Sequence, residues 1–302
     1  MSTERSTFSL GREEGSDGRF HRQQSRFRDW ADTTAPGRHH LYVSYACPWA
    51  HRTIIVRRLK GLEDVVGMSV VHPYRDQRGW AFPGGEHRDE LHDWDFLVDA
   101  YDASDPSFAG RVSVPVLWDT REHRIVNNES ADIIRMLNAW GTEGPDLYPE
   151  DLRAEIDAIN APVYDNVNNG VYRTGFATTQ EAYDEGFAVL FEWLDRLDER
   201  LGRQRYLAGD RITEADWRLF TTLLRFDAVY YVHFKCNGHR LIEYANLWPY
   251  ARELYQWPGV AETVRFDEIK RHYYTTHPQL NPHGIIAAGP LDMDWGEPHG
   301  RG

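Results

Sequence analysis

Cys47 lies where a predicted strand gives way to a predicted helix. Residues 40–46 are rich in aromatic and β-branched side chains, as in a strand, and residues 50–60 form a helical run. At the start of a helix, backbone N–H groups without intrahelical partners and the positive end of the helix dipole favour the thiolate form of cysteine. His51 and Arg52 lie one turn further on and could add positive charge. The sequence therefore predicts a nucleophilic sulfur, with a buried structural cysteine as the alternative.

The cysteine count limits the redox chemistry that Cys47 can perform. A dithiol oxidoreductase would need a second cysteine three residues on, where the chain has Ala50, and the one other cysteine, Cys236, is expected to be structural. A redox cycle at Cys47 must therefore use an external thiol. Two cysteines form no disulfide framework, which fits a reducing compartment.

Composition and charge exclude several functional classes. With 302 residues, 41% hydrophobic and 27% charged, the chain is expected to be soluble and long enough for two domains. A net charge of −13 disfavours nucleic acid and anionic membranes as partners. No stretch approaches the roughly 20 apolar residues of a membrane span, and no signal pattern opens the chain, so a cytoplasmic location is expected. The 14 histidines show no metal-ligand spacing, so no metal is expected.

The first half of the chain alternates strand and helix patterns. After the helix that follows Cys47, an apolar strand at 64–72 completes a βαβ unit whose strands should be parallel. Residues 73–110 have no clear periodicity and are expected to form an inserted loop region with a few helical turns. Two strands, at 113–119 and 125–127, should form a hairpin, followed by a helix that is capped at 128–130 and ends at Asn138.

The second half is predicted to be helical. Residues 141–149 contain two prolines and two glycines and are assigned as a linker. The fold class is therefore an α/β domain followed by an all-α domain, with an irregular arm at 1–36, an α/β domain at 37–145 and a helical domain at 150–290. Thr213 to Asp216 has the spacing of a capping box. The predicted helices cover residues 151–171, 179–201, 214–231, 247–256 and 259–274, the last broken near Asp267.

The segment from Tyr42 to Arg52 (Tyr-Val-Ser-Tyr-Ala-Cys-Pro-Trp-Ala-His-Arg) resembles the active-site segment of the glutathionyl-hydroquinone reductases, the Xi class of glutathione transferases. Several long matches in one order are far more specific than a single motif. In the tail, alanine stands at 287–288 where the family pattern leads us to expect proline. Further matches follow in family order at residues 79–82, 112–119, 127–134, 167–177, 225–237 and 272–274, so that the resemblance extends from about residue 20 to about residue 290.

The resemblance implies a thioredoxin-like N-terminal domain that binds glutathione as co-substrate. The bond between Val114 and Pro115 would be cis, leaving the Val114 backbone free to pair with the cysteinyl part of glutathione. Glu129 would accept from the γ-glutamyl ammonium and Ser130 would bind the γ-glutamyl carboxylate, although both could simply cap a helix. Trp80 and Arg111 would complete the pocket, with a solvated loop charge as the alternative for Arg111.

The resemblance also implies an acceptor pocket in the helical domain and a homodimer. Tyr172, Tyr230 and Tyr273 match family positions that line the hydroquinone site, where phenolic O–H groups can bond ring oxygens. Tyr231 or Tyr274 could be the true lining residue instead. Catalysis is assigned to Cys47, with Tyr172 and Tyr273 helping the departing aromatic carbon to take up a proton.

The expected activity is the glutathione-dependent reduction of an aromatic glutathione conjugate, a glutathionyl-hydroquinone, through a mixed disulfide between Cys47 and glutathione. One alternative is a general Cys-type, omega-like thioltransferase or dehydroascorbate reductase. Another is a non-catalytic glutathione-binding module in which the cysteine is a relic.

Overall fold

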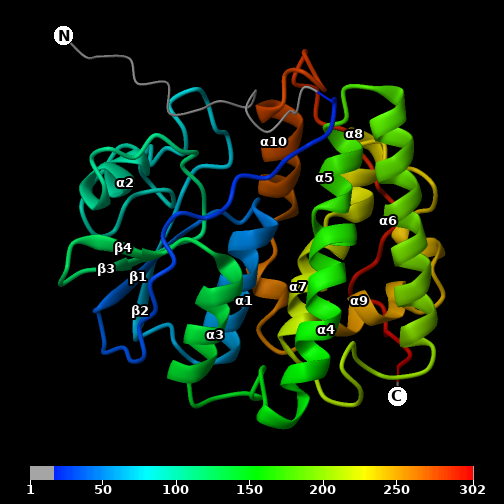
Figure 1. Ribbon diagram of the computed structural model, residues 1–302, viewed down its shortest axis with the longest axis horizontal. Coiled ribbons are helices and arrows are strands. Elements are labelled where there is room, and N and C mark those ends of the chain that lie inside the picture. Colours follow the sequence, from blue (N-terminus) through cyan, green and yellow to red (C-terminus); the bar gives the residue numbers. More distant parts are fainter. Residues whose placement is uncertain (1–16, 302) are drawn as a thin grey trace. The chain divides into compact units, whose positions relative to one another are not determined.

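A computed structural model describes residues 17–301 of the chain, which fold as two compact units (Figure 1). Unit 1 comprises residues 22–144 and 267–276, and unit 2 comprises residues 17–21, 145–266 and 277–301. The first 16 residues of the predicted arm lie outside the described residues. The predicted domain boundaries stay predictions. None of the helices in the described part of the chain has the length and apolar composition to cross a membrane.

Unit 1 is built on a four-stranded mixed sheet with the order β2-β1-β3-β4. Strand β1 pairs in parallel with β2 and antiparallel with β3, and β3 pairs antiparallel with β4. A parallel pair needs a crossover connection, which α1 provides, so the predicted βαβ unit and hairpin are both confirmed. The strands are β1 (His39–Val43), β2 (Val66–Val70), β3 (Val116–Asp119) and β4 (Arg124–Asn127).

The helices of unit 1 cover its sheet. Helices α1 (Pro48–Leu59) and α3 (Ser130–Trp140) contact each other on one face of the sheet, with α2 (Val98–Ser104) on the other side (Figure 1). As expected, the inserted region at 73–110 is mostly irregular and contains one helix, α2. The last helix of the chain, α10 (Phe266–Thr276), contributes residues 267–276 to this unit.

The described part of the arm, residues 17–36, is irregular but pairs with the edge of the sheet. Arg28 forms an antiparallel bridge with Asn127 of β4. The Asp29 N–H donates to the Val126 carbonyl at 3.1 Å, and the Asn128 N–H donates to the Phe27 carbonyl at 3.0 Å. The arm therefore covers backbone groups that an edge strand would otherwise expose.

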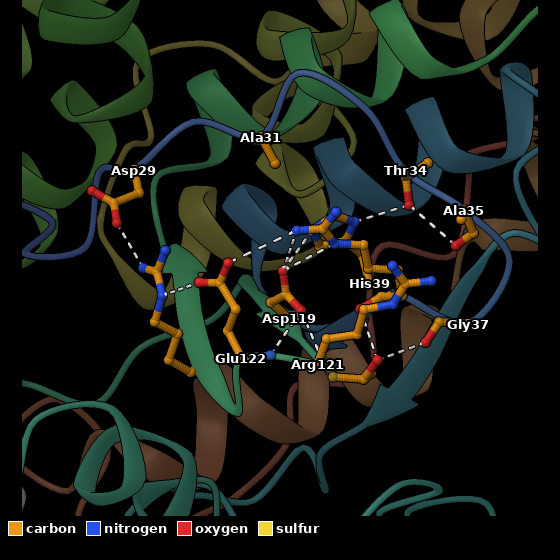
Figure 2. Close-up of polar contacts among 12 residues, drawn as sticks. Asp29, Ala31, Thr34, Ala35, Gly37, His39, Asp119, Arg121 and Glu122 are labelled. Atoms are coloured by element: carbon orange, nitrogen blue, oxygen red, sulfur yellow. Dashed lines mark hydrogen bonds and ion pairs between the residues drawn. The ribbon is translucent and has the colours of Figure 1, made fainter.

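Asp119, at the end of β3, ties the hairpin turn to β1 and to the arm (Figure 2). Its carboxylate accepts the backbone N–H groups of Arg121 and Glu122 at 2.8 and 3.1 Å. The buried ring of His39 lies 3.6 Å from the same carboxylate, and its Nδ1 is 2.8 Å from the Thr34 hydroxyl in the arm. Burial lowers the pKa of His39. This polar cluster fixes both the turn and the end of the arm that leads into β1.

Unit 2 is helical, and two of its predicted helices differ from the structure. The predicted helices 151–171 and 214–231 are each interrupted by a π-helical turn, η3 (Tyr164–Asn168) and η4 (Phe226–Tyr230). Each of these turns spans five residues, which is shorter than the window over which apolar periodicity is read, so the sequence pattern does not resolve them. The α-helices are α4 (Arg153–Val163), α5 (Gly170–Gly175), α6 (Gln180–Leu201), α7 (Glu214–Leu223), α8 (Tyr231–His233) and α9 (Leu247–Tyr255), with 3-10 turns η2 (Glu150–Leu152), η5 (Leu241–Glu243) and η6 (Ala261–Thr263).

The buried helix α7 anchors unit 2. The predicted capping box is present: the side chain of Thr213 and that of Asp216 satisfy each other's backbone N–H groups. Asp216 is fully buried and also accepts from the Leu207 N–H and the Tyr250 hydroxyl, each at 2.8 Å. One carboxylate thus fixes the start of α7, a loop and α9.

Candidate functional site

Cys47 is the N-cap residue of α1, directly after β1, and it is half-buried. Its Sγ lies 3.6 Å from the carbonyl oxygen of Val114. The helix begins with Pro48, and the N–H groups of its first turn have no intrahelical acceptors, although the Cys47 side chain makes no cap hydrogen bond with them. The predicted order of strand, cysteine and helix is confirmed.

Among the described residues, Val114 presents an unpaired backbone N–H beside this sulfur. The peptide bond between Val114 and Pro115 is cis, as the resemblance implies. Within residues 17–301, no acceptor is found for the Val114 N–H, while its carbonyl faces Cys47. An extended peptide could therefore form backbone hydrogen bonds with Val114 and place its own cysteine against Cys47.

The N-terminus of α3 carries Glu129 and Ser130. Glu129 is the N-cap residue, and its Oε1 accepts the Ala131 N–H at 3.1 Å, so helix capping, one of the two interpretations of the sequence, does occur. The Ser130 hydroxyl is buried and lies 3.4 Å from a guanidinium nitrogen of Arg52, itself 1% exposed. A helix N-terminus beside a buried arginine favours an anionic group, whereas the carboxylate of Glu129 favours a cation.

Trp80 has an unusual indole N–H. The ring is 3% exposed, the guanidinium of Arg75 lies over it at 5.1 Å from its centroid, and the ring of His272 stacks on it at 5.0 Å. Its Nε1 is buried and has no hydrogen-bond acceptor in the described part of the chain. A buried donor without an acceptor is costly, so a ligand acceptor would stabilise it.

Arg111 and Tyr273 also belong to unit 1. The backbone N–H of Arg111 donates to the side-chain oxygen of Gln23 in the arm at 3.0 Å. Tyr273 lies on α10, 5.3 Å from the His272 ring that stacks on Trp80. Tyr273 is thus connected to the surroundings of Trp80 through His272.

Tyr172 and Tyr230 lie together in unit 2. Their rings meet edge to face at 6.0 Å within an aromatic cluster that includes Phe234. Phe20, in the arm, stacks on Tyr172 at 6.0 Å. The two alternative lining residues differ in burial. Tyr231 is half-buried, whereas Tyr274 is buried, which raises the pKa of its hydroxyl to about 12.

Three arm residues that the sequence did not single out contact this site within unit 1. Arg22 lies over the ring of Trp49 at 4.8 Å, Gln23 accepts from Arg111, and Ser25 donates to Glu129 at 2.9 Å. The polar composition of the arm gave no local signal for these contacts, since they join residues that are far apart in the sequence.

Comparisons with known proteins agree with this arrangement. The family models described as glutathione S-transferase, N-terminal domain and C-terminal domain match residues 46–140 and 180–253. The glutathionyl-hydroquinone reductase YqjG of Escherichia coli is 52% identical over 94% of this chain and 92% of its own. Its glutathione-bound structure has a TM-score of 0.86, with 54% identity over 89% of each chain.

Two further proteins are similarly close. The glutathionyl-hydroquinone reductase PcpF of Sphingobium chlorophenolicum is 50% identical over 91% of each chain. The Xi-class transferase structure from Natrialba magadii has a TM-score of 0.88 and 51% identity over 94% of this chain and 95% of that one. The predicted fold class, a thioredoxin-like domain followed by a helical transferase domain, is confirmed. The chain therefore belongs to the Xi-class glutathione transferases, the family of the glutathionyl-hydroquinone reductases.

Proposed function

We propose that the protein uses glutathione to reduce glutathionyl-hydroquinones to hydroquinones, through a mixed disulfide on Cys47. The main observation behind this proposal is the half-buried Cys47 at the N-terminus of α1, with its sulfur beside the Val114 backbone. The relatives named glutathionyl-hydroquinone reductase support the choice of substrate.

The groups of unit 1 fit the parts of glutathione one by one. The cysteinyl part pairs with the Val114 backbone, which directs its sulfur to Cys47. The γ-glutamyl carboxylate binds at Ser130 and the N-terminus of α3, near the buried Arg52, and the ammonium binds Glu129. The glycyl carboxylate binds Arg111 and the indole N–H of Trp80, so the buried donor of Trp80 gains an acceptor.

The reaction is two successive exchanges at sulfur. The Cys47 thiolate attacks the sulfur of the glutathionyl-hydroquinone, the bond between that sulfur and the aromatic carbon breaks, and the carbon takes up a proton. This step leaves reduced hydroquinone and a disulfide between Cys47 and glutathione. A second glutathione thiolate then attacks the glutathione sulfur of that disulfide, which regenerates the Cys47 thiolate and releases glutathione disulfide. The sum converts one conjugate and one glutathione into hydroquinone and glutathione disulfide.

The tyrosines are proposed to act on the aromatic part of the substrate. Tyr172 and Tyr230, which lie edge to face, and Tyr273 would hydrogen-bond the ring oxygens, and Tyr172 and Tyr273 would assist protonation of the carbon. Replacing Tyr172 or Tyr273 with Phe should lower the rate of hydroquinone release while the rate of the second exchange, measured with a preformed mixed disulfide, is unchanged.

Mass spectrometry of the intact protein tests the central step. After a single incubation with a glutathionyl-hydroquinone and no free glutathione, we expect one glutathione adduct on Cys47 and one equivalent of free hydroquinone. Added glutathione should then remove the adduct and yield glutathione disulfide. An unmodified Cys47, with the conjugate bound intact, would refute catalysis and support a binding module.

The proposal includes a homodimer that works in the cytoplasm. Cytoplasmic thiols would keep Cys47 and Cys236, both free here, in the reduced form. Light scattering after size-exclusion chromatography should give twice the mass of one 35.2 kDa chain, and a single-chain mass would refute the dimer.

A further inference from the structure

The N-terminal arm reaches the proposed glutathione site at Glu129. The hydroxyl of Ser25 lies 2.9 Å from Glu129 Oε2 and 3.2 Å from the Asn128 carbonyl oxygen. Ser25 is half-buried, although its neighbours Gln24 and Arg26 are exposed. The arm therefore directs one polar side chain inward at this point.

Pairing with β4 fixes where Ser25 lies. Two residues further on, the Phe27 N–H donates to the Asn128 side-chain oxygen at 3.1 Å, and the Phe27 carbonyl accepts the Asn128 N–H at 3.0 Å. These two bonds set the register between the arm and the residue directly before Glu129. A shift of one residue along the arm would turn Ser25 away from Glu129.

Both oxygens of the Glu129 carboxylate are thus held. Oε1 accepts the Ala131 N–H at the start of α3, and Oε2 accepts the Ser25 hydroxyl. A carboxylate has about four lone-pair positions, two on each oxygen. Oε1 also accepts the Ser130 hydroxyl at 3.4 Å, so Oε2 is the oxygen that keeps room for a further donor. Two bonds on opposite oxygens restrict rotation of the carboxylate and reduce the ordering that a ligand would otherwise have to impose.

We propose that Ser25 is a positioning residue for glutathione, which orients Glu129 to receive the γ-glutamyl ammonium group. This inference rests on the proposed function, in which Glu129 binds that ammonium. Ser25 acts through Glu129, so its effect depends on the ligand carrying an amine.

Binding of two ligands separates this role from a general structural one. Calorimetry on the full chain would compare glutathione with N-glutaryl-cysteinylglycine, in which hydrogen replaces the γ-glutamyl amine. Ser25→Ala should weaken glutathione binding about fivefold, the effect of one hydrogen bond, and leave the affinity for the amine-free ligand unchanged. Ser25→Thr, which keeps the hydroxyl, should retain the parent affinity for glutathione.

Arg26→Gln is the matched control. Arg26 adjoins Ser25, is exposed, and pairs with Asp105 at 3.2 Å rather than with any residue of the site. Its replacement should change neither affinity. Melting temperatures of all variants would show that the arm has not been lost from the fold.

The outcomes separate the two proposals. Suppose that Ser25→Ala lowers the affinities for both ligands equally, or lowers neither, while the parent protein still binds glutathione more tightly than the amine-free ligand. The role of Ser25 is then refuted, and Glu129 remains the amine site. If the parent protein binds both ligands equally, Glu129 does not hold the amine, and the binding mode under the proposed function is overturned together with this inference.

Discussion

The two cysteines occupy opposite environments, one in each unit. Cys47 is half-buried at the start of α1, and its sulfur lies 3.6 Å from the Val114 carbonyl oxygen. Cys236 is 0% exposed, and its sulfur lies 3.8 Å from the carbonyl oxygens of Val171 and Phe234. Burial strongly raises the pKa of Cys236.

The difference in exposure and backbone environment supports separate roles for two chemically identical groups. A thiolate needs solvent, a positive charge or N–H donors, and Cys236 faces carbonyl oxygens that oppose a negative charge. The region around Cys236 should therefore contribute to stability and the region around Cys47 to turnover, which experiments on each cysteine can test.

The largest expected effect is on turnover. Cys47→Ala should lower the rate of hydroquinone release at least about 10⁴-fold, because the nucleophile is removed. Glutathione binding should stay nearly intact. The control, Cys236→Ala, should keep about the parent rate in the same assay of hydroquinone release. Retained activity in Cys47→Ala would refute the role of this cysteine.

Alkylation should distinguish the two thiols in the native protein. Iodoacetamide should modify Cys47 at least about 10³-fold faster than Cys236, since Cys236 reacts only in the small fraction of molecules that are open or unfolded. Peptide mass spectrometry over time gives both rates, and in strong denaturant the rates should converge. Comparable alkylation rates for the two thiols in the native protein would show that Cys236 is accessible and would contradict the difference in their environments.

The environment of Cys47 could be predicted from sequence because its signals are local. Aromatic and β-branched residues at 40–46, followed by Pro48 and a helical run, predict a strand that ends at the start of a helix. The capping box at Thr213 is likewise contained in four residues. The cis bond before Pro115 was expected only from the family resemblance, since local sequence does not fix a prolyl isomer.

The arm contacts could not be predicted in the same way. Ser25 and Glu129 are about a hundred residues apart, and their contact depends on which sheet edge the arm covers. The π-helical turns at 164–168 and 226–230 were not predicted either, because each is shorter than the window over which apolar periodicity is read.

Acid should destabilise the region around Cys236. His233, 6% exposed with its Nε2 3.1 Å from His277 Nδ1, has its pKa lowered to about 4 by burial and, secondarily, by Lys235. The unfolded chain, with an ordinary histidine pKa of about 6.5, binds this proton more readily, so stability is lost as the pH falls from about 6.5 to about 4. At pH 5 the loss from His233 should be about 2 kcal/mol.

Urea unfolding at pH 7.5 and pH 5.0 measures this loss. In His233→Gln the fall in unfolding free energy between the two pH values should be smaller than in the parent protein by about the same 2 kcal/mol. His40 in unit 1, whose pKa burial also lowers to about 4, is left unchanged and keeps its own acid sensitivity in both proteins. An identical pH dependence in variant and parent would contradict the role of His233.

The smallest expected effect is on stability, where Cys236 should matter more than Cys47, the reverse of the expectation for turnover. Cys236→Ser should lower the unfolding free energy by about 1–2 kcal/mol, because a hydroxyl replaces a weakly polar sulfur in a fully buried position. Cys47→Ser, at a half-buried helix N-cap where serine is a preferred residue, should leave the unfolding free energy within about 0.5 kcal/mol of the parent value. Urea unfolding of both variants beside the turnover assay should then show stability lost only at Cys236 and activity lost only at Cys47. A stability loss at Cys47 as large as that at Cys236 would mean that Cys47 is also part of the packed structure, and its loss of activity could no longer be attributed to the missing nucleophile alone.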